Sequence, residues 1–100
     1  MRQRAVVISP TDNVATAISH LKAGSTVQVD AGGQRLELAL RDDIRFGHKF
    51  SLAHIEAGAP VVKYGEVIGT ATKVIEPGEH VHVHNVASTR GRGDLAKEGR

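Results

Sequence analysis

A short pattern built around glycine recurs along this sequence and constrains the fold more than any other feature. Each copy is a charged residue, then Gly two positions later, then Val three positions after that: Lys22–Val27, Glu56–Val61 and Glu76–Val81. Gly readily takes the positive φ that tight turns need, and Val favours the strand that follows. Because the spacing between copies is irregular, a solenoid array is excluded. The pattern predicts a compact β fold in which turns lead repeatedly into short strands.

Short apolar or alternating runs predict the strands of this fold, at residues 5–8, 26–30, 36–40, 61–63, 67–72 and 80–85. The runs at 26–30 and 36–40 both alternate, and Ala31-Gly32-Gly33 lies between them. Two alternating runs joined by Gly-Gly are typical of a β-hairpin. We therefore expect a mainly β chain with at least one hairpin.

One short helix is expected near the N-terminus. Thr11 or Asp12 suits its N-cap, and Gly24 suits the position just past its end. The residues that would form its buried face, at i, i+4 and i+7, are Val14, Ile18 and Leu21. Residues 51–55 favour at most a further turn or two of helix. The expected fold is thus mainly β with this single helix before residue 24.

Length and charge indicate one domain followed by a tail. The 100 residues suffice for a single domain with a modest core. Of the 13 Lys and Arg, four lie from Arg90 onward, and of the 11 Asp and Glu, two lie there, so the remaining nine and nine balance. The tail therefore carries the whole excess charge of +2. We expect a domain over residues 1–89 and a flexible, basic, Gly-rich tail over residues 90–100.

Composition also excludes several classes of protein. The chain has no Cys, which rules out disulfides and thiolate metal sites. Nucleic-acid binders usually have a basic face interleaved with aromatic residues, and the aromatic content of 3% is too low for such a face. The apolar run after the basic N-terminus is too short for a signal peptide, and no stretch approaches the roughly 20 apolar residues of a membrane span. We expect a soluble, cytoplasmic protein that binds neither nucleic acid nor membrane.

Three histidines near the C-terminus suggest a metal site. His80, His82 and His84 alternate with Val81 and Val83. On a strand, this alternation would place the three imidazoles on one face and both valines in the core. Two His at i and i+2 can reach one metal ion, and imidazole is a common ligand of transition metals. A strand whose polar face simply meets solvent or a partner remains the alternative.

Two further clusters combine a cation with other polar groups. In Phe46-Gly47-His48-Lys49, the imidazole could act as an acid or base and the ammonium could bind a carboxylate. In Lys63-Tyr64-Gly65-Glu66, the cation and the phenol could hold a carboxylate and a hydroxyl. The alternatives are a polar loop at the first cluster and, at the second, a hairpin turn with Tyr64 over the sheet edge.

Taken in order, these blocks resemble a known family. Asp12–Ala15, Phe46–Leu52, Val62–Gly69 and Gly78–Asn85 are similar to the N-terminal region of the altronate and galactarate dehydratases, which is a SAF domain. The resemblance covers residues 5 to about 92 and implies a β-clip fold. It also implies a hydro-lyase that converts a sugar acid to a 2-keto-3-deoxy acid with a divalent metal, iron(II) or manganese.

The resemblance further implies a division of labour with a longer chain. The full enzymes continue into a much larger catalytic region, so we expect a small subunit or N-terminal domain that is not a complete enzyme alone. Its partners would be a large catalytic dehydratase subunit and the sugar acid. Whether the chain also forms homo-oligomers, and whether the metal lies on this chain or on its partner, is left open. The implied site residues are His48 and Lys49 for catalysis, Lys63, Tyr64, Gly65 and Asn85 for substrate, and His82 and His84 for metal.

Two other functions remain compatible with the same resemblance. The sulfolactate sulfo-lyases also place a small SAF-type chain beside a large one, and they break a C–S bond in place of C–O. SAF-type domains occur as well in non-catalytic modules that bind a carbohydrate or a protein. Tight metal binding through the histidines would favour an enzyme over such a module.

Overall fold

The computed structural model describes residues 5–7, 9–31 and 34–88. Within those ranges the chain forms nine strands and no helix, so no helix there is long and apolar enough to cross a membrane. The expectation of a mainly β fold is confirmed. The predicted tail over 90–100 lies outside the described residues. The strands are β1 (Ala5–Val6), β2 (Val14–Ala17), β3 (Thr26–Ala31), β4 (Gln34–Ala39), β5 (Lys49–Ser51), β6 (Pro60–Lys63), β7 (Glu66–Ala71), β8 (His80–Val81) and β9 (Val86–Ser88).

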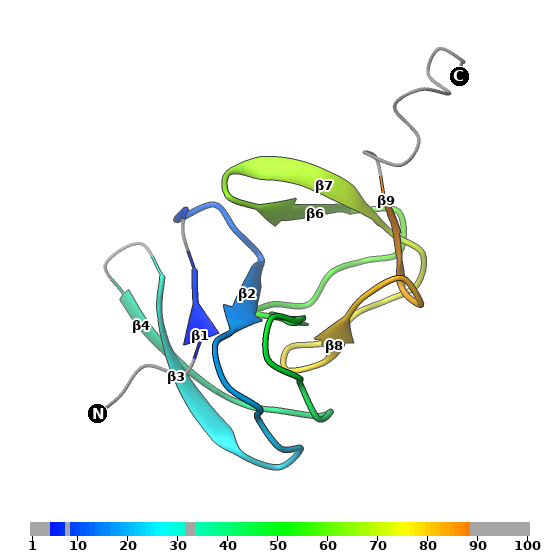
Figure 1. The fold of residues 1–100 in the computed structure, drawn as a ribbon. Coiled ribbons are helices and arrows are strands. Elements are labelled where there is room, and N and C mark those ends of the chain that lie inside the picture. Colours follow the sequence, from blue (N-terminus) through cyan, green and yellow to red (C-terminus); the bar gives the residue numbers. More distant parts are fainter. Residues whose placement is uncertain (1–4, 8, 32–33, 89–100) are drawn as a thin grey trace.

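The strands form three antiparallel sheets. A central sheet has the order β1-β2-β5-β8, a two-stranded hairpin is β3-β4, and a three-stranded sheet has the order β6-β7-β9. Figure 1 shows the central sheet between the β3-β4 hairpin and the β6-β7 hairpin. The hairpin expected from the Gly-Gly junction is therefore present, and the runs at 61–63 and 67–72 form a second one.

Each hairpin covers its own hydrophobic core against the central sheet. On β2, Ala15 and Ala17 belong to the core under β3-β4, whereas Val14 belongs to the core under β6-β7. Successive side chains of a strand point to opposite faces, so β2 contributes to both cores. Phe50 on β5 is fully buried in the first core, and Val81 on β8 is fully buried in the second. The central sheet is thus apolar on both faces.

The helix expected over residues 11–24 is wrong, because this segment contains strand β2. Residues 14–17 pair with β1 on one side and with β5 on the other. Asp12, one of the two residues that suited an N-cap, and its neighbour Asn13 bond to distant backbone instead. Asp12 Oδ1 accepts from the Gly65 N–H at 2.8 Å, and Asn13 Oδ1 accepts from the Val62 N–H at 2.8 Å. Long-range pairing has overridden a local pattern that fits either structure.

Four copies of one tight turn organise the chain. In each, a Gly with φ between 85° and 89° occupies the third position, and the N–H after it donates to the carbonyl three residues earlier, as in a type II turn. The recurring sequence pattern covers three of these turns. The fourth, Arg45–His48, escapes it because Phe50 stands where the other copies have Val. The four turns span residues 22–25, 45–48, 56–59 and 76–79.

The turns relate two halves of the fold to each other. Leu21 forms an isolated bridge with Ile44, and Ile55 forms the equivalent bridge with Ile75. All four of these side chains are buried. The helical turn expected at residues 51–55 is therefore absent, since Ser51 ends β5 and Ile55 lies in a bridge. In each half, one turn leads into a hairpin and the other leads into a short strand of the central sheet.

Candidate functional site

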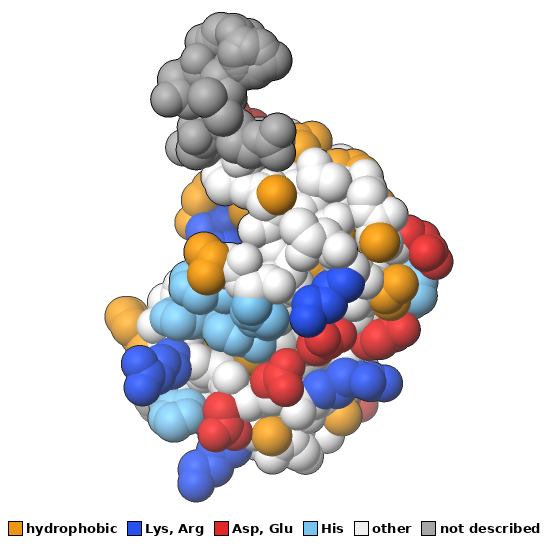
Figure 2. Space-filling model, turned by 90° about the vertical axis from the view of Figure 1, so that its right-hand side faces the viewer, with side chains coloured by type: hydrophobic (Ala, Val, Ile, Leu, Met, Phe, Trp, Pro, Cys, Tyr) orange, Lys and Arg blue, Asp and Glu red, His pale blue; other side chains and the backbone are white. Residues whose placement is uncertain are grey.

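Pairing between β5 and β8 gathers the histidines on one face. The two strands are antiparallel, with Phe50 opposite His80. His48 lies just before β5, and His82 lies just after β8. Figure 2 shows most of the His side chains of this face as one contiguous patch, with Lys and Arg side chains on both sides of it. Residues far apart in the sequence thus become neighbours.

The imidazoles of His48, His80 and His82, called here the imidazole cluster, stack on one another. Their ring centroids lie 5.2, 4.9 and 5.5 Å apart. His48 Nδ1 and His80 Nε2 are 2.9 Å apart, which is a hydrogen bond. One nitrogen from each ring lies within 4.8 Å of the other two, so among the described residues these three side chains could hold a metal ion.

Burial, and then the crowding of basic groups, lowers the pKa values of three groups on this face. Burial lowers the pKa of His80, and the neighbouring imidazoles lower it further, while Asp42 acts in the opposite direction. Burial and the nearby His48 lower the pKa of His82. Burial, followed by the charge of Lys63, lowers the pKa of Lys49. Neutral imidazoles, with free lone pairs, are the forms that bind metals and accept protons.

The strand expected over residues 80–85 ends early, at Val81. Residues 82–85 form a turn, and Val83 is 80% exposed, so the prediction that both valines face the core is wrong for Val83. Asn85 explains the turn. Its side chain is fully buried, its Oδ1 accepts from the His82 N–H at 3.0 Å, and its Nδ2 donates to the His80 carbonyl at 2.9 Å. These two bonds bend the chain directly after β8.

This turn separates the two histidines that the sequence paired as metal ligands. His82 joins the imidazole cluster, whereas His84 stacks on His80 from another side with a centroid distance of 5.3 Å. Within the described part of the chain, His84 is not part of the group that could hold a metal. The structure therefore brings His82 together with His48 and His80.

The predicted substrate-binding residues of the β6-β7 hairpin lie in its turn. Tyr64 has a positive φ of 57° and is 56% exposed, and the Lys63 Nζ lies 4.5 Å from the centre of its ring. The Gly65 N–H donates to Asp12. The alternative interpretation of this cluster as a hairpin turn is confirmed. Lys63 is nevertheless close enough to Lys49 for its charge to affect that ammonium group.

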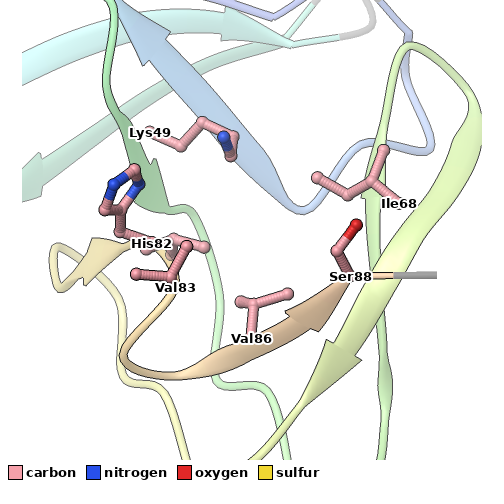
Figure 3. Close-up of a pocket in the computed structure, with 7 residues that line it drawn as sticks. Lys49, Ile68, His82, Val83, Val86 and Ser88 are labelled. Atoms are coloured by element: carbon pink, nitrogen blue, oxygen red, sulfur yellow. The ribbon is translucent and has the colours of Figure 1, made fainter. Parts of the chain in front are cut away.

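A pocket of about 210 Å³ opens beside the imidazole cluster. Its walls are apolar and include Ile68, Val81 and Val86, while Lys49, His82 and Ser88 provide polar groups. Figure 3 shows Lys49 and His82 on one side of the pocket and Ile68 and Ser88 on the opposite side. An apolar pocket with a few convergent polar groups is the usual form of a small-molecule site.

A second hollow, of about 390 Å³, lies on the other side of the cluster. It is lined by His20, Asp43, Arg45, His48 and His80. The cluster therefore stands between two concave surfaces. Sequence reasoning assigned no role to His20, Asp43 or Arg45, and it named His80 in the histidine strand but not in the final pair of metal ligands. The signal that was missed is the fourth turn, at residues 45–48, because it leads into β5, the strand that pairs with β8.

His54 has a contrasting environment. Its Nδ1 lies 3.0 Å from Glu76 Oε1, and its Nε2 lies 2.6 Å from Glu56 Oε2. Hydrogen bonding to Glu76, and then to Glu56, raises the pKa of His54. With a carboxylate at each ring nitrogen, the exposed His54 has a pKa shifted in the opposite direction to those of His80 and His82.

Comparison with known proteins matches this chain to one family. The family model described as the altronate/galactarate dehydratase SAF domain matches residues 3–89. Altronate dehydratase of Escherichia coli K12 is 45% identical over 80 residues, and that of Bacillus subtilis 168 is 40% identical over 80 residues. Each alignment covers 80% of this chain but only 15% of the relative.

In a third relative, the alignment covers nearly the whole protein. The (2R)-sulfolactate sulfo-lyase subunit alpha of Paracoccus pantotrophus is 39% identical over 62 residues, which are 62% of this chain and 92% of that subunit. The same SAF fold is therefore found as part of a much longer chain and as nearly all of a short subunit. With a family match across most of its length, this chain belongs to the altronate/galactarate dehydratase SAF domain family.

Proposed function

We propose that this chain is the accessory SAF module of a sugar-acid dehydratase of the altronate type, and that it acts with a larger catalytic region. The observation that carries this proposal is the convergence of His48, Lys49 and His82 beside one small pocket. Relatives whose printed name is altronate dehydratase support the substrate class. The alignment with 15% of their length supports the need for a larger partner.

The reaction requires groups that this face can supply. The proton beside the carboxylate leaves carbon 2, the C–O bond at carbon 3 breaks, the departing hydroxide takes a proton to form water, and the enol becomes the 2-keto-3-deoxy acid. Lys63 is the proposed carboxylate partner, since it lies close enough to the pocket residue Lys49 for its charge to act on that ammonium group. Tyr64, which packs on Lys63, is the proposed contact for a substrate hydroxyl.

His48 and Lys49 are the proposed acid–base groups. Lys49 lines the pocket, and burial lowers its pKa, which eases release of its proton. His48 can pass a proton to His80 across their 2.9 Å hydrogen bond. The Gly65 N–H and the Asn85 side chain already form hydrogen bonds within the fold. Substrate binding by these two residues remains a prediction and is not part of this proposal.

A divalent metal, iron(II) or manganese, completes the proposed chemistry. When bound, such an ion polarises a carboxylate and eases departure of a hydroxide. The imidazole cluster fits an ion, because one ring nitrogen of each residue lies within 4.8 Å of the other two. The carboxylate-binding and proton-transfer roles above belong to this chain's own side chains and are tested without reference to where the ion sits.

A reconstitution assay tests the proposal. Altronate dehydration, scored as 2-keto-3-deoxy acid with iron(II) or manganese present, is measured for this chain alone, for the large catalytic chain alone and for both mixed. We expect activity in the mixture alone, and a strong loss with Lys49→Met. Lys22→Met, which removes an exposed Lys of the first turn, is the matched control. A large chain whose turnover is indifferent to this one would refute the proposal.

A sulfo-lyase subunit is the second candidate, and one observation favours it. The alignment covers 92% of a relative named as a sulfolactate sulfo-lyase subunit alpha, so a chain even shorter than this one works there as a subunit. The same mixing assay with sulfolactate and a large sulfo-lyase chain, scored by sulfite release, separates the two candidates. Sulfite formation without altronate turnover would transfer the assignment to the C–S lyase.

A further inference from the structure

The imidazole cluster has the geometry of an open three-ligand metal site. In a tetrahedral site with metal–nitrogen bonds of about 2.0–2.1 Å, ligand nitrogens lie roughly 3.3 Å apart. His48 Nδ1 and His80 Nε2 are 2.9 Å apart, and the nitrogen of His82 lies within 4.8 Å of both. Small side-chain rotations therefore bring all three nitrogens onto one ion.

The backbone holds two of these ligands in advance. The His80 N–H donates to Asp42 Oδ2 at 2.9 Å, and the His82 N–H donates to the buried Asn85 side chain at 3.0 Å. The third ligand, His48, follows the type II turn of residues 45–48, whose closing bond is 2.9 Å. Ligands held by packing and hydrogen bonds before the ion arrives lose little conformational freedom on binding.

The cluster is also open to a ligand. His48 and His80 are half-buried, whereas His82 is exposed. The pocket of about 210 Å³ adjoins the cluster at His82, and the hollow of about 390 Å³ adjoins it at His48 and His80. Three protein ligands with a free position are typical of catalytic metal sites, whereas structural sites are closed by four.

The ligand set selects among metals. All three ligands are imidazole nitrogens, which suit zinc, copper, iron and nickel, while manganese and magnesium prefer carboxylate, carbonyl and water oxygens. Among the described residues, no carboxylate belongs to the group. The site therefore favours iron(II), cobalt(II) or zinc over manganese. Of the two metals that the family resemblance implies, iron(II) fits this site better than manganese.

We propose that His48, His80 and His82 form a three-imidazole binding site for a borderline divalent transition metal on this chain, with one position open towards the adjoining pocket. His48 binds through Nδ1 and His80 through Nε2. This deepens the proposed function by placing a metal on the SAF module, and it takes His84 out of the ligand set. With the ion bound, His48 is a ligand, so the acid–base role falls to Lys49.

The test measures metal binding by the full chain without any partner or substrate. Cobalt(II) serves as the probe, followed by its visible absorption and by calorimetry, and zinc is then used to displace it. We expect one cobalt(II) per chain, displaced by zinc, with manganese binding at least tenfold more weakly. Because no activity is read, failure of this site and failure of the proposed function are distinguishable.

Single substitutions decide between the structural and the sequence-based ligand sets. We expect His48→Ala, His80→Ala and His82→Ala each to weaken cobalt(II) binding by about 100-fold or more, beyond the roughly 10–100-fold cost of losing an outer-shell partner. His84→Ala and His54→Ala are the matched controls and should bind normally. His48→Gln replaces His48→Ala if the latter does not fold, as judged from its NMR spectrum.

Three results would overturn the proposal. The first is the absence of stoichiometric cobalt(II) and zinc binding by the folded wild-type chain. The second is binding that survives His48→Ala but is lost in His84→Ala, which would restore the pair His82 and His84. Binding lost equally in His54→Ala would also overturn it, since that residue lies outside the imidazole cluster.

Discussion

The two arms of the imidazole cluster begin with the same turn but are held in different ways. The first arm, residues 45–51, supplies His48, and the second arm, residues 76–85, supplies His80 and His82. Each turn is anchored by reciprocal backbone bonds. The Gly47 N–H donates to Ala17, whose N–H donates to His48, and the Gly78 N–H donates to Ser51, whose N–H donates to Glu79, at 2.8–2.9 Å. Beyond this shared device, their surroundings diverge.

The second arm is packed and hydrogen-bonded at several points. Gly78 is buried, and a Cβ at its position would clash with the Ala39 carbonyl oxygen. Asp42 and Asn85 hold the N–H groups of His80 and His82. In the first arm, by contrast, Gly47 is exposed, and a Cβ there would meet nothing within 4 Å. The second arm is therefore held rigidly by packing and hydrogen bonds, whereas the turn of the first arm lies at the surface and tolerates substitution.

The largest effect is expected from Gly78→Ala. The substitution adds about 1–2 kcal/mol for the positive φ of 87° and about 1–3 kcal/mol for the clash, so we expect the free energy of unfolding to fall by about 2–5 kcal/mol. Urea denaturation measures it. A loss of stability no greater than that of Gly47→Ala would contradict the conclusion that the second arm is the more constrained one.

Asn85→Ala should have the next largest effect. It leaves the His82 N–H and the His80 carbonyl without their partner, at a cost of about 1–3 kcal/mol in the free energy of unfolding. It should also shift the NMR signals of His82 and weaken cobalt(II) binding. Asn13→Ala is the matched control, because Asn13 likewise bonds to two backbone groups, those of Pro60 and Val62. The control should lose stability but keep the metal site, and an equal loss of cobalt(II) binding in both variants would contradict a local role for Asn85.

Gly47→Ala tests the first arm. Only the backbone conformation opposes it, since φ is 85° and the space around the Cβ is empty, so we expect a loss of about 1–2 kcal/mol in the free energy of unfolding. The variant should remain folded and retain His48 in the cluster. Thermal unfolding followed by circular dichroism, with and without cobalt(II), measures both. A variant that no longer folds would mean that the first arm is as constrained as the second.

The smallest effect is the pH dependence, and it differs in sign between histidines. His54 has a raised pKa, so it contributes stability that is present below about pH 6.5 and is lost as the pH rises through its folded pKa. His80 and His82 have lowered pKa values, so stability rises with pH from their folded pKa up to about 6.5. An NMR titration of the metal-free chain should show His54 with the highest midpoint of the three. Glu76→Gln should lower the midpoint of His54 and leave that of His82 unchanged, and the reverse order of midpoints would contradict these environments.

Much of the β architecture could be predicted because its signals are local. The hairpin around residues 32–33 follows from two alternating runs, and the turn at Tyr64 follows from a polar Tyr-Gly pair between two apolar runs. The segment over residues 14–21 could not be assigned in the same way. Its Val14, Ile18 and Leu21 fit a helical face, and only pairing with β1 and β5 made residues 14–17 a strand.

The site shows the same division. Repetition of His at alternate positions correctly drew attention to residues 80–84. The buried Asn85 ends the strand at Val81, and His84 stacks on His80 but lies outside the group of three side chains that could hold a metal ion. His48 enters the cluster from 32 residues earlier, through the pairing of β5 with β8. No spacing rule within a single strand could place that side chain beside His80 and His82.

The sequence by itself determined the turns, the β content and the family, because a positive φ at Gly and the alternation of apolar residues act over a few neighbouring positions. Tertiary structure alone decided which turns lie next to each other, as the turns before β5 and β8 do. Strand pairing, burial on both faces of the central sheet and the Asn85 bonds set the positions of the imidazoles. Their chemistry depends on distances of a few ångströms between residues remote in sequence, which local preferences cannot specify.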